Sequence, residues 1–253
     1  MRRPSSARLV RIAVRDAPSA RYLERIGIRH ALVPDAVHAL GVVEPAIAPA
    51  ARDTAILQVS TAVLDAMGVA ALAHAIRTSR ALDGLRIRLL PAGIARRHDS
   101  IAAYLRLLDR IGPHADVDLI RERRPLQLVL QIRDARVVIG TSLHVRVVAA
   151  AYGVARVSLA KNKPTRYAKT WDPDMPYGVT ADRLDGAVAA ALAQAERPEA
   201  GEHAAALAWR AHEHLEDLAA QVLAVARDET AEDWAARAAR RVRAPSRAPV
   251  CFA

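Results

Sequence analysis

A histidine at the start of a predicted helix is the residue best placed to do chemistry. Residues 134–159 read as strand, tight turn, helix, glycine stop and strand, with His144 in the first helical turn. Thr141, in the turn before it, can cap the helix. The N–H groups of that first turn then point out at the carboxyl end of the strand, where parallel sheets bind ligands and helix starts favour anions. His144 could transfer a proton or hydrogen-bond a phosphate, or only satisfy a backbone group, and spacing alone leaves both open.

A second polar segment, residues 91–100, also lies between a predicted strand and a predicted helix. His98 and Asp99 could therefore face the same crevice as His144. Either Asp99 or Ser100 could cap the helix predicted at 101–111, and for Asp99 the role of a plain N-cap is the favoured interpretation.

A third segment, residues 161–171, holds all three lysines of the chain together with Arg166 and Tyr167. Lys163 and Arg166 could hold a phosphate or carboxylate, the lysine as a point charge and the arginine as a fork. The alternative interpretation of the segment is a solvated loop.

No motif for a metal or a nucleotide cofactor is present. The sequence has no zinc-ligand spacing, Walker phosphate loop, nucleophile elbow or complete Gly-x-Gly-x-x-Gly. His203, His212 and His214 are interpreted as surface residues of alanine-rich helices, and the last two do not share a helical face. We expect neither a metal site nor a bound cofactor.

The elements that must position these residues alternate between strands and helices. Strands are predicted at 8–14, 30–33, 55–59, 85–90, 116–120, 135–139 and 155–159, and helices at 17–26, 61–80, 101–111, 125–133 and 142–152. This alternation indicates an α/β fold, a parallel sheet with helices on both faces. Residues 41–53 are predicted to be a linker between subdomains, and the alanine-rich residues 182–241 to be helical.

Composition and charge exclude several classes of protein. The chain has 253 residues, 52% of them hydrophobic, and a single cysteine, which excludes a disulfide miniprotein and fits a cytoplasmic location. No apolar run reaches the roughly 18 residues of a membrane span, and the start has no signal-peptide pattern. The net charge of +10 comes from the arginines of residues 1–15 and 237–253, so the body is neutral and no specific nucleic-acid binding is expected. The basic tail could lie on an anionic membrane, which would make the protein membrane-peripheral.

Ordered motifs between about residues 9 and 185 resemble those of the polysaccharide pyruvyl transferases. The first comprises Val14-Arg15-Asp16, Ser19-Ala20, Tyr22-Leu23, Gly27 and Val33-Pro34-Asp35. The second comprises Ile139-Gly140-Thr141-Ser142-Leu143-His144, Ala149, Ala151, Gly153 and Val154. Lys163 and Tyr167 match a Lys-x-x-x-Tyr element of the family, and Leu90-Pro91 with His98-Asp99 resembles the stretch between the two motifs.

The resemblance implies a fold like that of the two-domain GT-B glycosyltransferases. It implies transfer of the enolpyruvyl unit of phosphoenolpyruvate to a glycan or lipid-linked sugar in cell-surface polysaccharide assembly, with phosphoenolpyruvate as donor substrate and no separate cofactor. By resemblance, His144 is the acid/base residue. The donor would be bound by Arg15, Thr141, Ser142, Leu143, Lys163 and Tyr167, while His98, Asp99 and Arg166 are further candidates.

Two departures from the family pattern shape the expected domains. Many members have arginine where this chain has Ser142, so one expected anion ligand is absent. The chain also starts near the end of the family's N-terminal domain, and a second chain could supply the rest. We expect a remnant of that domain at 1–45, a GT-B-like C-terminal donor-binding domain at 46–185, a helical region at 186–236 and a disordered basic tail at 237–253.

Two other functions stay open at this stage. One is a nucleotide-sugar glycosyltransferase of the same architecture, which would need an acidic residue placed for a ribose after a donor-site strand. The sequence does not identify that residue. The other is a catalytically degenerate domain that acts as a binding or assembly partner.

Overall fold

The computed structural model describes residues 12–44, 52–93, 99–112 and 116–228, with side chains up to residue 223. Residues 12–214 form one compact unit, and a second unit comprises residues 1–11 and 215–253. His98 and the basic tail at 237–253 lie outside the described residues, as does the first part of the strand predicted at 8–14.

The first described elements form a small strand–helix–strand unit, as predicted. The parallel strands β1 (Ala13–Val14) and β2 (Ala31–Leu32) are joined by helix α1 (Ala17–Arg25). The Asp16 carboxylate caps α1 by accepting from the Ser19 N–H at 2.9 Å. The 3₁₀ helix η1 (Ala36–Ala39) and helix α2 (Leu40–Val43) follow.

The prediction that the linker begins at residue 41 was wrong, because residues up to Val43 are helical. The apolar residues Val37 and Leu40 pack against the buried cluster on one face of the main sheet, and this packing orders the segment. Residues 45–51 of the predicted linker lie outside the described residues.

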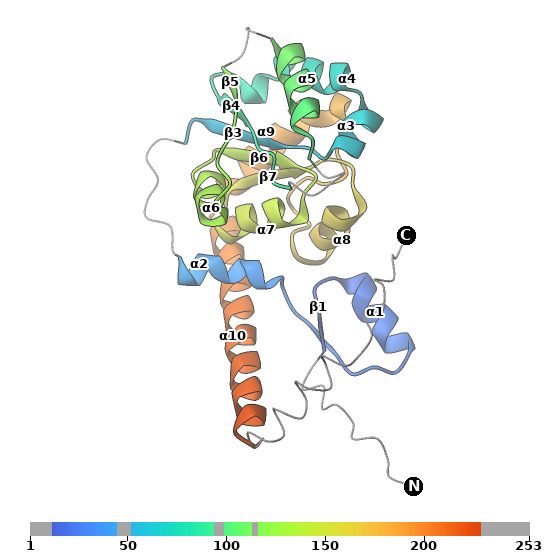
Figure 1. The fold of residues 1–253 in the computed structure, drawn as a ribbon, viewed down its shortest axis with the longest axis vertical. Coiled ribbons are helices and arrows are strands. Elements are labelled where there is room, and N and C mark those ends of the chain that lie inside the picture. The colour runs from blue at the N-terminus through green and yellow to red at the C-terminus, as the bar shows by residue number, and fades with distance from the viewer. Residues whose placement is uncertain (1–11, 45–51, 94–98, 113–115, 229–253) are drawn as a thin grey trace, which may run out of the picture. The chain divides into compact units, whose positions relative to one another are not determined.

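A five-stranded parallel sheet forms the centre of the molecule. Its strands are β3 (Thr54–Gln58), β4 (Arg86–Leu89), β5 (Val117–Leu119), β6 (Val137–Gly140) and β7 (Ala155–Ser158), in the spatial order β5-β4-β3-β6-β7 (Figure 1). The chain builds the sheet to one side of β3 and then crosses to the other side. A crevice is therefore expected at the carboxyl ends of β3 and β6, where the order reverses.

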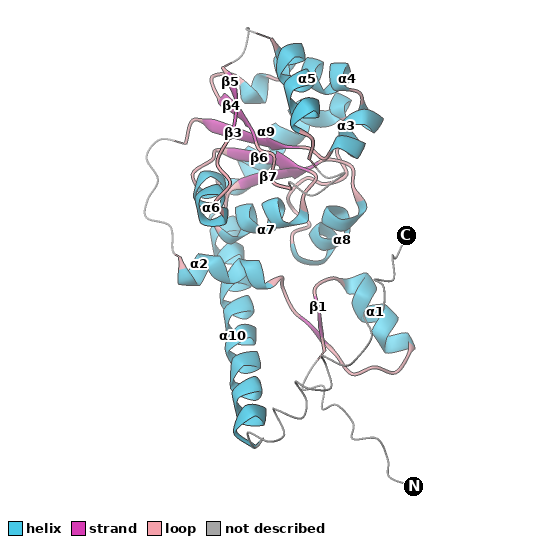
Figure 2. Cartoon of the chain, viewed as in Figure 1, coloured by secondary structure: helices cyan, strands magenta, loops and turns pink. Residues whose placement is uncertain are grey.

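Helices cover both faces of this sheet (Figure 2), which confirms the predicted fold class. They are α3 (Thr61–Met67), α4 (Val69–Thr78), α5 (Ile101–Ile111), α6 (Pro125–Arg133), α7 (Leu143–Ala151), α8 (Asn162–Trp171), α9 (Leu184–Ala195) and α10 (Pro198–Asp228), with short 3₁₀ turns η2 (Arg80–Leu82) and η3 (Ala181–Arg183). The helix predicted at 61–80 is interrupted by Gly68, whose φ is +86°. The alanine-rich region predicted at 182–241 is helical as far as it is described, up to Asp228.

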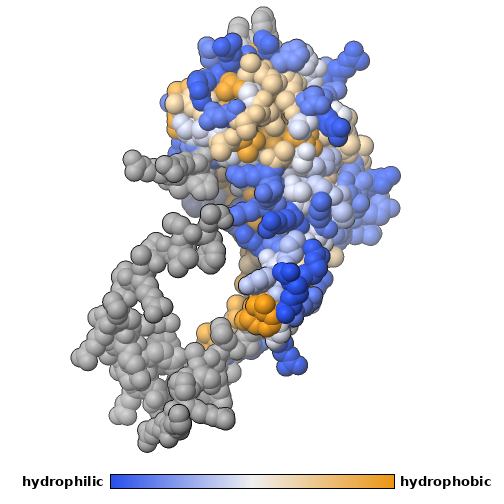
Figure 3. Space-filling model, turned by 90° about the vertical axis from the view of Figure 1, so that its right-hand side faces the viewer, coloured by the Kyte–Doolittle hydropathy of each residue, from blue (hydrophilic) through white to orange (hydrophobic). Residues whose placement is uncertain are grey.

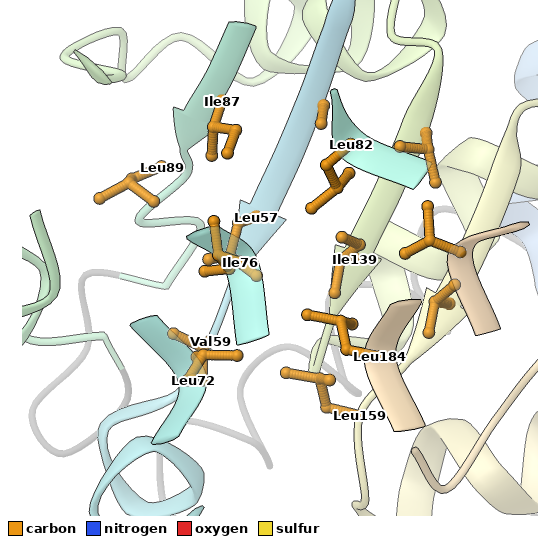
Figure 4. Packing of buried hydrophobic residues seen from close by; sticks show 14 of the residues in the cluster. Leu57, Val59, Leu72, Ile76, Leu82, Ile87, Leu89, Ile139, Leu159 and Leu184 are labelled. Atoms are coloured by element: carbon orange, nitrogen blue, oxygen red, sulfur yellow. The ribbon is translucent and has the colours of Figure 1, made fainter. Parts of the chain in front are cut away.

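Alternating side chains of the strands build the two layers of the core. Leu57 of β3 packs with the helices α3, α4, α5 and α9 on one face, whereas Ile56 packs with α6 and α7 on the other. Figure 4 shows aliphatic side chains of the sheet, including Leu57 and Ile139, meeting Ile76 of α4 and Leu184 of α9. This period of two is the pattern of a sheet buried on both faces.

The surface is mixed in character. On the face drawn in Figure 3, hydrophilic side chains cover much of the described surface and apolar ones gather in smaller areas. Among the described residues, no helix combines the length and the hydropathy that crossing a membrane requires.

Candidate functional site

A cavity of about 600 Å³ opens at the carboxyl ends of β3 and β6, where the strand order reverses. The residues that line it are Arg15, Gln58, Ser60, Ala92, Gly93, Asp99, Thr141, Ser142, Leu143, His144, Val145, Lys161, Asn162 and Lys163. These come from the N-terminal segment, the ends of β3, β4, β6 and β7, and the first turns of α7 and α8. The three polar segments singled out in the sequence therefore converge on one crevice.

Gln58, the last residue of β3, connects two segments that line this cavity through hydrogen bonds of its side-chain amide. Its side-chain oxygen accepts from the N–H groups of Thr141 at 3.0 Å and Ser142 at 2.7 Å. Its side-chain nitrogen donates to both carboxylate oxygens of Asp99 at 3.1 Å. Each end of the amide thus faces the partner its chemistry requires. Gln58 is 2% exposed, and its bonds to Thr141 and Ser142 fix the start of α7 against β3, whereas the Asp99 end of the amide is partly open to water.

The cap of helix α7 is Ser142, and the prediction that Thr141 caps it was wrong. The Ser142 hydroxyl accepts from the Val145 N–H at 3.5 Å. Thr141 is 1% exposed, and its hydroxyl instead accepts from the Ser60 N–H at 2.9 Å. Because Gln58 occupies the Ser142 amide, the first-turn N–H groups that have no intrahelical acceptor are those of Leu143 and His144.

His144 is exposed and lines the cavity from the first turn of α7. The neighbouring Leu143 is buried in a small cluster with Tyr167 and Trp171 of α8, which anchors this end of the helix. The helix thus buries Leu143 and leaves the imidazole of His144 facing the cavity and water.

Residues 161–171 supply two of the cavity's cations. They form helix α8, so the alternative of a solvated loop was wrong. Proline is tolerated in a first helical turn, and Pro164, Tyr167, Ala168 and Trp171 are buried at helical spacing. Lys161 donates to the Ser60 hydroxyl at 3.1 Å, whereas Lys163 is exposed at the rim.

Tyr167 and Arg166 are placed differently from Lys163, because neither lines the cavity. Arg166 is exposed elsewhere on α8. Tyr167 is 2% exposed, and its hydroxyl accepts from the Asp35 N–H at 3.0 Å. Burial raises the pKa of Tyr167, which keeps the hydroxyl neutral. Its contact with Asp35 makes Tyr167 part of the support for the N-terminal segment.

Arg15 reaches the cavity because the N-terminal segment is bonded to helix α8. Its guanidinium pairs with the Asp35 carboxylate at 2.6 Å, and Asp35 is held by Tyr167. The Arg15 carbonyl accepts from the Trp171 indole N–H at 2.9 Å, and the Ala17 N–H donates to the Thr170 hydroxyl at 3.1 Å. The three bonds to α8 each span more than a hundred residues of sequence, and together with the Asp35 pair they set where the guanidinium points.

Asp99 lies at the cavity and does not cap a helix, so the favoured interpretation of this residue was wrong. Ser100 is the N-cap of α5, without a side-chain capping bond. The Asp99 carboxylate accepts from Gln58 and from the Gly93 N–H at 2.9 Å.

Arg146 does not replace the arginine that many family members have at the position of Ser142. It is 3% exposed and points away from the cavity, pairing with Asp172 at 2.7 Å and donating to the Ser158 hydroxyl. Arg156 pairs with the same carboxylate at 2.6 Å. Burial alone would raise the pKa of Asp172, but the two arginines outweigh it and hold that pKa below its usual value.

Sequence reasoning missed Gln58, Ser60 and Lys161 as residues of the site. Gln58 and Ser60 are polar residues at the carboxyl end of an otherwise apolar strand, which was a usable signal in a parallel sheet. Lys161 was seen only as part of a lysine-rich segment. Within the described ranges, no group of three or more histidine, cysteine or acidic side chains is placed to hold a metal ion.

Fold and cavity together define an α/β domain with a cationic crevice suited to an anionic ligand. The family model of polysaccharide pyruvyl transferase matches residues 3–161, and the chain belongs to this family. No curated protein matches the chain.

Solved structures resemble the fold at low sequence identity. The UDP-GlcNAc 2-epimerase from Neisseria meningitidis bound to UDP-GlcNAc is 11% identical with a TM-score of 0.52, over 80% of this chain and 59% of that one. The spinosyn rhamnosyltransferase SpnG is 17% identical with a TM-score of 0.45, over 66% and 43% of the two chains. The glycotransferase of kitacinnamycin is 20% identical with a TM-score of 0.42, over 70% and 44%. The chain thus spans between 43% and 59% of the length of these proteins.

Proposed function

We propose that this chain transfers the pyruvyl unit of phosphoenolpyruvate to hydroxyl groups of a sugar during synthesis of a cell-surface polysaccharide. The observation that carries the proposal is the convergence of Arg15 with His144 and the lysines Lys161 and Lys163 on one cavity. Arg15 lies far from the other groups in sequence, so only the folded chain brings them together.

The charges of the cavity suit the donor. Phosphoenolpyruvate carries a phosphate and a carboxylate, and the cavity offers three cationic side chains and the N–H groups of Leu143 and His144. Many family members have an arginine at the position of Ser142. Lys161 is our candidate for the cation that takes over its role, because the Lys161 ammonium group reaches Ser60 beside the start of α7.

His144 is the proposed acid/base residue. Protonation of the methylene carbon of the enol produces an oxocarbenium-like centre, to which a first sugar hydroxyl adds. Phosphate then leaves with the electron pair of its C–O bond, and a second hydroxyl of the sugar adds to the cation that remains, which closes the pyruvate ketal. One hydroxyl proton restores the acid form of His144, and the other goes to the departing phosphate. An imidazolium at the cavity wall can donate the first proton, and cationic side chains stabilise the departing phosphate.

Calorimetric binding of phosphoenolpyruvate tests the proposal. Wild type is compared with Arg15→Ala, Lys163→Ala and His144→Ala. Lys169→Ala is the matched control, because Lys169 is an exposed lysine of the same helix that does not line the cavity. We expect Arg15→Ala to weaken binding about 10- to 100-fold, the usual worth of a hydrogen bond to a charged group, and the control to bind as wild type does. Undiminished binding in Arg15→Ala would contradict the proposed donor site.

A nucleotide-sugar glycosyltransferase is a second candidate, because Asp99 supplies a carboxylate at the crevice after β4. Such a group could accept from ribose hydroxyls. Saturable binding of uridine diphosphate, with none of phosphoenolpyruvate, would favour this function. If neither uridine diphosphate nor phosphoenolpyruvate binds, and His144→Ala changes the binding of no other ligand, the results favour a degenerate domain that acts as a binding partner.

A further inference from the structure

Asp99 is the one carboxylate among the described residues that line the cavity, where it accompanies three cationic side chains. Arg15 pairs with Asp35 and Lys161 donates to Ser60, so neither neutralises Asp99 in this structure. Among the described residues, the carboxylate of Asp99 accepts hydrogen bonds from the neutral donors Gln58 and Gly93. A carboxylate beside a proposed anion site that pairs with none of the described cationic side chains calls for a physical reason.

The contacts of Asp99 fix its orientation and leave capacity to bind. Its Oδ2 atom accepts from the Gly93 N–H at 2.9 Å and from Gln58 at 3.1 Å, whereas Oδ1 accepts from Gln58 alone. A carboxylate has about four lone-pair sites, so Oδ1 keeps one that no described residue uses. Asp99 is partly exposed, and a ligand in the cavity can therefore reach that atom.

Electrostatics favour different groups of this cavity for the two substrates of a transfer reaction. A doubly anionic donor is attracted to Arg15, Lys161 and Lys163 and repelled by Asp99. A neutral molecule with hydroxyl groups meets no such repulsion, and its O–H groups are donors to the carboxylate. Gln58 holds Asp99 beside the start of α7, and hence next to the wall that carries His144.

We propose that Asp99 is the acceptor-binding group of the cavity, and that the acceptor is an uncharged sugar whose hydroxyls donate to it. The inference rests on the proposed pyruvyl transfer and adds the location and charge class of the acceptor. Acidic sugars are disfavoured, because their carboxylate would lie close to that of Asp99.

The test uses the full chain and two kinds of probe. Methyl glycosides of glucose, galactose and mannose are titrated by ligand-observed NMR beside the matching uronic acids, and phosphoenolpyruvate is titrated by calorimetry. The variants are Asp99→Asn and Asp99→Glu, with Asp65→Asn as control, because Asp65 is an exposed carboxylate of α3 outside the cavity. Urea unfolding of each variant establishes that it is folded.

We expect wild type to bind a neutral glycoside better than its uronic acid. Asp99→Asn should weaken that binding about tenfold, equivalent to about 1.4 kcal/mol, and leave phosphoenolpyruvate affinity unchanged or higher because a like charge is removed. Asp99→Glu keeps the charge but displaces it, so only glycoside binding should fall.

Three results would overturn the inference: no neutral glycoside binds wild type, uronic acids bind equally well, or Asp99→Asn binds glycosides as wild type does. A different result would separate the two proposals. If glycosides bind in a way that depends on Asp99 but phosphoenolpyruvate does not bind, the sugar subsite stands and the proposed pyruvyl transfer is overturned.

Discussion

Replacing Gln58 by methionine should loosen the start of helix α7 and destabilise the fold. Methionine nearly matches glutamine in size, so the change removes hydrogen bonds without leaving a void. The Ser142 N–H, bonded at 2.7 Å, and the buried Thr141 hydroxyl, bonded at 3.2 Å, lose their acceptor, whereas the Thr141 N–H keeps the Gln58 backbone oxygen at 3.1 Å. One amide left without an acceptor costs about 1–3 kcal/mol, and the lost bond to Asp99 adds less, because water reaches that carboxylate. The easier burial of a thioether offsets part of this, so we expect about 2 kcal/mol.

Urea unfolding measures this difference directly. For a unit of about 200 residues, 2 kcal/mol corresponds to a fall in Tm of about 4–8 °C. Gln127→Met is the matched control, because Gln127 on α6 is partly exposed and its side chain makes no hydrogen bond to a described residue. It should change stability by less than about 0.5 kcal/mol. Phosphoenolpyruvate should also bind Gln58→Met more weakly, since the helix start is no longer held. A variant as stable as wild type would refute the assignment of Gln58 as the residue that ties β3 to α7.

Three further predictions concern stability. Asp172→Asn leaves two buried arginines without their carboxylate, and we expect a loss of about 3–5 kcal/mol in urea unfolding, where a loss under about 1 kcal/mol would contradict the pairing. Gly41→Ala would place a Cβ atom 2.7 Å from the Ala151 carbonyl oxygen and should lower Tm, whereas Gly186→Ala, in an open position of α9, should raise stability by about 0.5–1 kcal/mol. His38 is fully buried, and burial, with Arg156 nearby, lowers its pKa from 6.5 to about 4. The unfolded chain therefore takes up this proton first, so stability should fall by up to about 1.4 kcal/mol per unit as the pH drops from 6.5 towards 4, and His38→Leu should unfold with a shallower pH dependence.

Elements with strong local signals could be predicted from the sequence closely. Helices α5 and α6 begin and end at the predicted residues, because Gly112 stops the first and Pro125 starts the second. Helix α8 was harder to identify, since its many polar residues resemble a loop and its buried face is narrow. The spacing of Pro164, Tyr167 and Trp171 contained the helical period and could have revealed it.

The sequence by itself determined the alternation of strands and helices, the strand–turn–helix that carries His144, and the motifs of the family. These features depend on neighbours in the chain: apolar periodicity, glycine stops and capping residues.

Only the tertiary structure decided which groups share the cavity. The Gln58 amide faces two N–H groups at one end and a carboxylate at the other only because the ends of β3 and β6 lie side by side. Arg15 lines the cavity only because Asp35, Tyr167 and Trp171 hold it there. Such contacts join residues far apart in the chain. Local propensity does not encode them, because they form only when the sheet and its helices pack together.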